Sequence, residues 1–225
     1  MLIACLCVCF GQSKSGRKCT LLMLEDLELS DVFYKDGRTL QPLNQQKNVR
    51  SLPFFLKPTE QNFDLLIVNP KAGEPDQPSH ILVGRAPLVG KPKAVMLLVA
   101  KNPEGDLPLK IGVLDDTLRG FPVSTVRYAN FSSQPLYVKI GEKVTKLKQG
   151  VFTDIKVKAE EGGGYLYATY ADQKARKLDH KRMYMHSRAR KIIVLTDPTR
   201  KGRKLGYTFI PQNISPEQLA AAGGA

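Results

Sequence analysis

The sequence predicts an all-β protein built from two tandem, Ig-like antiparallel β-sandwich domains. Short apolar runs separated by Gly and Pro residues favour many strands over long helices. A β-rich pattern also occurs twice, because residues 33–43 are echoed by 137–147 and residues 97–103 by 192–198. The echoes lie about 104 and about 95 residues apart, a spacing too long for a solenoid repeat and typical of two small sandwiches, which indicates an internal duplication.

The chain of 225 residues is long enough for two domains that each bury a core of their own. We expect the first sandwich over residues 20–115 and the second over 116–213, joined at the segment 115–122. Residues 1–19 are predicted to be a signal peptide or tether, and residues 214–225 a flexible tail.

In the first half, a strand region over residues 21–34 leads into Asp36-Gly37, a pair typical of hairpin turns. Further apolar runs predict strands at 53–56, 63–68, 81–83, 94–100 and 107–113. Residues 69–78 contain three Pro and one Gly residue, which predicts an irregular loop.

In the second half, apolar and polar residues alternate with a period of two over 136–140 and 151–158, as in strands with one buried face. Strands are also expected at 165–170, 182–186, 191–195 and 205–210. By position, residues 54–57 correspond to 155–158 and residues 63–68 to 165–170, and the tip 102–106 corresponds to the longer, basic tip 197–204.

All four cysteines lie at the start of the chain, at positions 5, 7, 9 and 19. The folded body is therefore expected to need neither disulfides nor a cysteine-based metal site. The apolar run 2–10, about nine residues long, is too short to span a bilayer. It suits the apolar region of a secretory signal, although no Lys or Arg precedes it. We expect export to the periplasm or cell surface, with a cytoplasmic location as the alternative.

The net charge of +13 is concentrated between residues 171 and 204. Twelve basic side chains lie there against three Asp residues, and they are the predicted binding site for an anion or a partner: Lys174, Arg176, Lys177, Lys181, Arg182, Arg188, Arg190, Lys191, Arg200, Lys201, Arg203 and Lys204. The alternative is a solvated edge and hairpin tip whose charges discourage edge-to-edge aggregation.

The segment 126–141, VRYANFSSQPLYVKIG, resembles a class of small, exported, uncharacterised bacterial all-β proteins. Their sandwich domains open with an R-hydrophobic-x-N-hydrophobic-S/T strand, which a P-h-x-V-x-h-G hairpin follows. The preceding LDDTLRGFP at 114–122 is similar to the segment before that strand, and the resemblance extends over residues 114–158. It implies the sandwich fold and export, and it implies no activity.

Motifs for catalysis and for cofactors are weak. The soft-ligand residues His180, Met183, Met185 and His186 are close in sequence, but a buried Met pair beside a surface His is the interpretation we favour over copper. Neither a nucleophile elbow nor a Walker loop occurs. We therefore expect no enzymatic activity, no metal and no cofactor.

The main hypothesis is a non-catalytic binding or structural module of the bacterial envelope, whose basic surface meets an anionic surface, an envelope component or another protein. The first alternative is a cytoplasmic nucleic-acid-binding protein, in which Tyr170, Tyr184 and Tyr207 stack on bases. The second alternative is a hydrolase with an unrecognised site.

Overall fold

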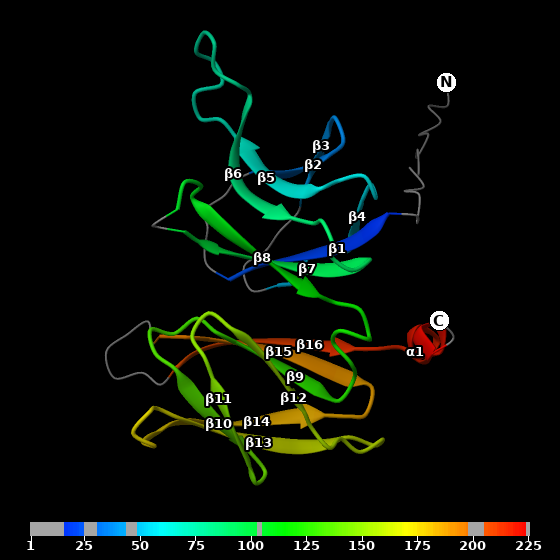
Figure 1. The fold of residues 1–225 in the computed structure, drawn as a ribbon, viewed down its shortest axis with the longest axis vertical. Coiled ribbons are helices and arrows are strands. Elements are labelled where there is room, and N and C mark those ends of the chain that lie inside the picture. Colours follow the sequence, from blue (N-terminus) through cyan, green and yellow to red (C-terminus); the bar gives the residue numbers. More distant parts are fainter. Residues whose placement is uncertain (1–15, 25–30, 44–48, 103–104, 198–204, 224–225) are drawn as a thin grey trace, which may run out of the picture. The chain divides into compact units, whose positions relative to one another are not determined.

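The computed structural model describes residues 16–24, 31–43, 49–102, 105–197 and 205–223. Within these ranges it contains sixteen strands and one short helix, so the all-β prediction is confirmed (Figure 1). The chain divides into two compact units. The first contains the segments up to Leu22, Leu27–Gln45 and Ser51–Leu114, and the second consists mainly of Asp115–Ala225. Arg50 also belongs to the second unit.

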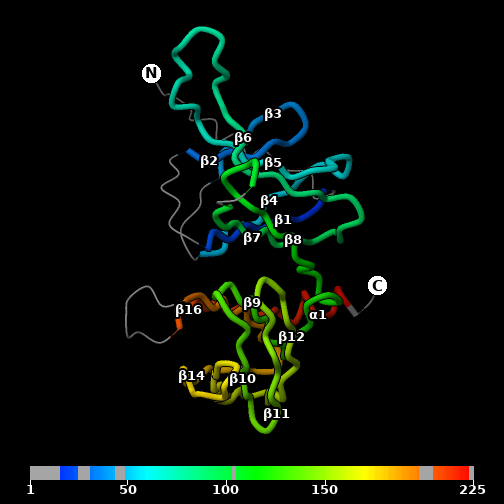
Figure 2. The backbone as a smooth tube through the Cα atoms, turned by 60° about the vertical axis from the view of Figure 1, so that its left-hand side comes forward, coloured from blue at the N-terminus to red at the C-terminus, as the bar shows by residue number. Residues whose placement is uncertain are grey.

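The first unit is one sheet of eight strands in the order β3-β2-β5-β6-β8-β7-β1-β4. The strand bounds are β1 (Arg17–Met23), β2 (Val32–Asp36), β3 (Thr39–Pro42), β4 (Phe54–Leu56), β5 (Asn62–Val68), β6 (His80–Pro87), β7 (Ala94–Lys101) and β8 (Leu109–Asp115). Residues 69–78, between β5 and β6, form neither strand nor helix, as predicted, and this loop extends well beyond the sheet (Figure 2).

This sheet folds back on itself to enclose a core. The Tyr34 ring on β2 lies 4.5 Å from the Phe54 ring on β4, although the two strands are far apart in the sheet order. Phe63 on β5 completes the group, at 6.0 Å from Phe54. The strands β3-β2-β5-β6 form one half of the sheet and β8-β7-β1-β4 form the other. In the described residues these halves are joined by a short parallel pairing, in which Gly84 of β6 is opposite Leu109 of β8. The unit is therefore sandwich-like.

The second unit consists of two four-stranded sheets, β11-β10-β13-β14 and β12-β9-β15-β16. The strand bounds are β9 (Thr125–Asn130), β10 (Leu136–Ile140), β11 (Lys143–Leu147), β12 (Phe152–Lys156), β13 (Gly164–Ala171), β14 (Lys177–Met185), β15 (Ala189–Thr196) and β16 (Gly206–Asn213). Neighbouring strands are antiparallel, except that β9 and β15 run parallel.

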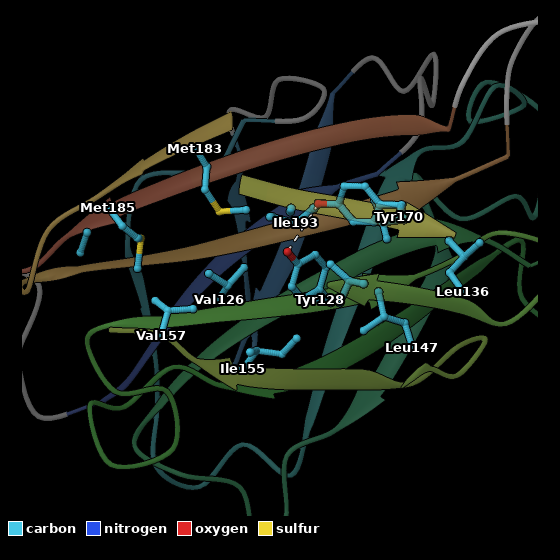
Figure 3. Close-up of a cluster of buried hydrophobic side chains, with 14 residues drawn as sticks. Val126, Tyr128, Leu136, Leu147, Ile155, Val157, Tyr170, Met183, Met185 and Ile193 are labelled. Carbon is cyan, nitrogen blue, oxygen red and sulfur yellow. Dashed lines mark hydrogen bonds between the residues drawn. The ribbon is translucent and has the colours of Figure 1, made fainter. Parts of the chain in front are cut away.

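The core of the second unit lies between these two sheets (Figure 3). Met183 and Met185 of β14 point into it together with Ile193 of β15, as the predicted Met pair required. The hydroxyls of Tyr128 and Tyr170 lie 3.4 Å apart inside the core. Burial is the main cause that raises the pKa of both phenols, so each stays neutral and can donate a hydrogen bond.

The two units have the same strand order. Each strand of the first unit has a counterpart eight strands later in the same place, since β3-β2-β5-β6 matches β11-β10-β13-β14 and β8-β7-β1-β4 matches β16-β15-β9-β12. The segments that echo each other in the sequence fall on these matched strands. The equivalence is one of topology, and common ancestry remains a prediction.

The matched hairpins β2–β3 and β10–β11 also share a turn. Each has a two-residue loop that begins with glycine, Gly37 with φ 66° and Gly141 with φ 58°. Glycine adopts this left-handed conformation with the least strain, which explains why both sequences place it there. The predicted turn pair Asp36-Gly37 is shifted by one residue, because Asp36 still pairs with Thr39 in the ladder.

The two ends of the chain differ from the prediction. Strand β1 begins at Arg17, so residues 17–19 belong to the fold and not to a tether, while residues 1–15 lie outside the described ranges. Residues predicted as a flexible tail form helix α1 (Pro216–Gly223). Its start is capped by reciprocal hydrogen bonds, from Gln218 N to Ser215 Oγ at 3.2 Å and from Ser215 N to Gln218 Oε1 at 2.9 Å.

In the described part of the chain, no helix is both long and apolar enough to cross a membrane.

Candidate anion-binding face of the second unit

The twelve predicted basic residues do not form one surface. Six of them are exposed or half-buried: Lys174, Arg176, Lys177, Lys181, Arg182 and Arg188. Four lie in the hairpin tip outside the described residues: Arg200, Lys201, Arg203 and Lys204. Arg190 and Lys191 are buried, with exposed fractions of 4% and 7%, so they cannot belong to a binding surface.

Arg190 is buried because its guanidinium binds the segment that precedes β9. It donates to Asp116 Oδ1 at 2.8 Å and to the carbonyl oxygens of Phe121 at 2.6 Å and Asp116 at 3.1 Å. Its guanidinium also covers the Phe121 ring at 4.6 Å, and Arg127 covers the same ring at 4.2 Å. Desolvation lowers the pKa of Arg190 to about 10, so it is charged at neutral pH.

Lys191 follows Arg190 on β15 and is also part of the packing. Its Nζ lies 4.5 Å from the centre of the Phe209 ring, and burial lowers its pKa. The predicted surface was wrong at these two positions because β15 is buried along seven of its eight residues, from Ala189 to Leu195.

Other predicted cations are held by local pairs. Arg176 Nη2 lies 2.6 Å from Asp172 Oδ2, and Lys181 Nζ lies 3.3 Å from Asp179 Oδ2. Lys181 also lies 5.4 Å from the Tyr207 ring. Of the predicted stacking tyrosines, Tyr184 is exposed, whereas Tyr170 is buried and Tyr207 is half-buried.

The outer face of the sheet β11-β10-β13-β14 carries a group of exposed aromatic and basic side chains. Residues directly opposite each other in a ladder point to the same side of the sheet, so the strand registers define the set. We call it the tyrosine–cation face, and it consists of Tyr137, Lys139, Val144, Lys146, Tyr165, Tyr167, Thr169, His180, Arg182 and Tyr184.

The tyrosine rings on this face are held in place by their neighbours. Tyr165 and Tyr184 face each other across the ladder with ring centres 5.6 Å apart, and the Arg182 guanidinium lies 4.4 Å from the Tyr165 ring. His180 stacks on Tyr167 at 5.7 Å with an interplanar angle of 17°. Even so, Tyr165, Tyr167 and Tyr184 are 57%, 52% and 45% exposed.

A groove of about 370 Å³ lies on the same face, and residues of the turn between β13 and β14 form part of its lining. Its lining includes Tyr137 and Lys139 from β10 and Lys177 from the start of β14. A register shift between Tyr170 and Ala171 bends the hairpin there. Asp172 holds the turn by accepting from the backbone N–H groups of Lys174 at 2.9 Å and Arg176 at 3.0 Å.

The outward charges on the four strands of this face are all positive, and the one carboxylate in the lining of the groove, Asp172 in the turn, is paired with Arg176. Among the four strands of the sheet the only acidic residue is Asp179, which is buried and paired with Lys181. Lys139, Lys146 and Arg182 therefore have no carboxylate facing them from these strands. Such a face attracts anions, and its exposed rings offer flat surfaces for stacking.

Within the described residues, no group of three or more His, Cys, Asp and Glu side chains is arranged to hold a metal ion. His180 bonds to Thr169 Oγ1 at 3.0 Å and His186 to Asn213 Oδ1 at 3.1 Å, while the two methionines face the core.

A comparison of the chain with models of protein families and with curated proteins finds no match. The fold and the site define a class only: a β-sandwich protein of two units, the second of which exposes aromatic and basic side chains on one sheet.

Sequence reasoning missed Tyr137, Lys139, Tyr165 and Tyr167 as members of the site. Their signal was the period-two alternation, in which each lies on the side opposite to a buried neighbour such as Val138. The density of charge along the chain predicted Arg190 as a site residue instead. Arg190 is close to Arg182 in sequence, but it lies on the other sheet.

Proposed function

We propose that this chain is a non-catalytic binding module, which holds an anionic polymer on the tyrosine–cation face of its second unit. The observation that carries the proposal is a sheet face with exposed Lys139, Lys146 and Arg182 and no outward carboxylate on its four strands. The first unit then acts as a scaffold.

The test is binding to inorganic polyphosphate, a polyanion without rings. A variant with Lys139→Gln, Lys146→Gln and Arg182→Gln should bind more weakly, and its affinity should fall less steeply with salt. Each lost phosphate contact lowers the slope of log affinity against log salt by about one.

The control changes the same number of exposed cations in the first unit, at Lys35, Lys71 and Lys110. It should bind polyphosphate as the unmodified protein does. Equal losses in both variants would indicate a response to net charge alone, and the proposed site would then be wrong.

We place the module in the bacterial envelope, with the apolar run 2–10 as the apolar part of an export signal. This run lies outside the described residues. Fractionation of the producing cell followed by amino-terminal sequencing tests the location. A cytosolic protein that keeps its first eleven residues would contradict export.

Both units are proposed to be Ig-like sandwiches that arose by duplication. The support is the shared order of eight strands and the glycine that opens each matched hairpin. Sequences of relatives provide the test. If their two units are no more alike than either is to an unrelated sandwich, common ancestry is refuted.

A further inference from the structure

The tyrosine–cation face has aromatic rings at the spacing of alternate strand residues. Tyr165 and Tyr167 project from β13, one of the two inner strands of the sheet, and are about 7 Å apart along it. Tyr184 lies opposite Tyr165 on β14, and Tyr137 lies on β10 at the other side of β13. Rings on three adjacent strands thus share one surface.

These rings are prepared for contact with a flat ligand. Arg182 covers the Tyr165 ring and His180 stacks on the Tyr167 ring, while about half of each tyrosine remains exposed. The Tyr184 hydroxyl donates to the carbonyl oxygen of Gly162 at 2.9 Å, which fixes that ring as well. Little side-chain freedom is therefore lost when a ligand stacks here.

Cations lie on both sides of the tyrosine row. Arg182 is directly opposite Tyr167 on β14, and Lys139 is opposite Thr169 on β10. Lys177 joins Lys139 in the lining of the groove, at the end of the row. A chain of anionic groups that follows β13 would meet positive charge along its length.

We propose that the tyrosine–cation face binds single-stranded nucleic acid, with bases stacked on Tyr165 and Tyr167 and phosphates beside Arg182, Lys139 and Lys177. The inference rests on the proposed function and names its ligand. Every base has a π-face, and stacking on aromatic side chains beside a basic groove is the general mode of single-strand binding. The chemistry is the same whichever compartment supplies the strand.

The alternatives fit this face less well. Base pairs of a duplex hide the faces of their bases, so exposed tyrosines gain nothing from them. A neutral sugar could stack on the same rings, but it would leave Lys139, Arg182 and Lys177 without an anionic partner. The four strands also offer neither an outward carboxylate nor an outward carboxamide. For the same reason the face has few groups that could read base edges, and we expect little sequence preference.

The experiment measures binding of a fluorescently labelled oligothymidylate of about twelve nucleotides, within the usual site size of such proteins. Tyr165→Ala with Tyr167→Ala should weaken this binding at least about 30-fold, since each stacked base contributes about 5- to 150-fold. The same variant should bind inorganic polyphosphate unchanged. Tyr165→Phe with Tyr167→Phe should restore oligonucleotide binding, because the rings remain.

Phe131→Ala provides the control, since Phe131 is a partly exposed ring of the same unit outside this face. If the alanine variant binds the oligonucleotide as the unmodified protein does, stacking is refuted while the polyphosphate site stands. If neither polyanion binds, both proposals fail. Tighter binding of duplex DNA or of a sulfated glycan than of the single strand would also overturn the inference.

Discussion

Replacement of Arg190 by Met tests whether this residue has a structural role and not the anion-binding role that the charge pattern predicted. Methionine fills part of the same space but offers no donors. The variant loses the hydrogen bonds to Asp116 Oδ1 at 2.8 Å and to Phe121 O at 2.6 Å. The buried Asp116 carboxylate then keeps only its ion pair with Arg50.

The expected loss of stability is about 3 kcal/mol, the lower end of the usual cost of removing one partner of a buried ion pair, because Arg50 still compensates the Asp116 charge. The net contribution of the Arg190–Asp116 ion pair to the free energy of unfolding is smaller than this loss. Desolvation brings the pKa of Arg190 down to about 10, which means that its contacts do not fully offset the cost of burying the charge. Arg190→Met combined with Asp116→Leu should therefore be less destabilising than the sum of the two single changes.

Urea unfolding followed by far-ultraviolet circular dichroism measures these differences, and the transition of the second unit is the one to compare. Arg188→Met is the matched control, because Arg188 is exposed two residues earlier and should cost less than about 0.5 kcal/mol. If Arg190→Met and Arg188→Met unfold at the same urea concentration, the structural role of Arg190 is refuted.

Three further predictions concern the second unit. Tyr170→Phe removes a buried hydroxyl that lies 3.4 Å and 3.2 Å from two other tyrosine hydroxyls, and it should cost about 1–2 kcal/mol in urea unfolding; no change would refute the hydroxyl chain. Burial alone would raise the pKa of Asp172, but hydrogen bonds from Arg176 and from backbone N–H groups lower it. The carboxylate therefore stabilises the fold above the unfolded-state pKa of about 3.9, and this stabilisation is lost as pH falls through the folded-state pKa. At pH 7, Asp172→Asn should lower the urea midpoint relative to the unmodified protein. This difference in midpoint should shrink at pH values well below about 3.9. Gly141→Ala should cost about 1 kcal/mol because φ is 58° there, whereas Gly162→Ala, at an open position without such a φ, should cost little; equal effects would contradict the turn assignment.

Most strands could be predicted because their patterns are local, although the first five residues of β14 (Lys177–Met185) were missed. Leu136 and Val138 are buried and Lys139 is exposed, as period-two alternation requires. The pairing of strands could not be predicted, because register and sheet order depend on contacts between distant segments. The matched echoes nevertheless fall on matched strands, since turn glycines and apolar runs recur in the same order.

The site was harder to predict than the fold. Charge counted along the chain treats Arg182 and Arg190 alike, yet one faces solvent and the other is buried. The apolar run 192–195 that follows Arg190 did carry a warning, because a strand without alternation has both faces covered. Arg190 and Lys191, which precede this run on the same strand, are therefore expected to be buried.

The matched sheets of the two units differ in the surroundings of their outward cations. On the first unit's counterpart sheet, Arg85 of β6 is directly opposite Asp64 of β5, and its guanidinium donates to both carboxylate oxygens at 2.6 Å and 2.8 Å. On the second unit, Arg182 of β14 is directly opposite Tyr167 of β13. The outward cation on β6 is thus neutralised by a carboxylate, whereas the outward Arg182 on the matched strand β14 lies beside exposed rings. If the two units share an ancestor, the loss of outward carboxylates from this sheet and the gain of outward rings are the changes that would convert a structural sheet face into the proposed binding face.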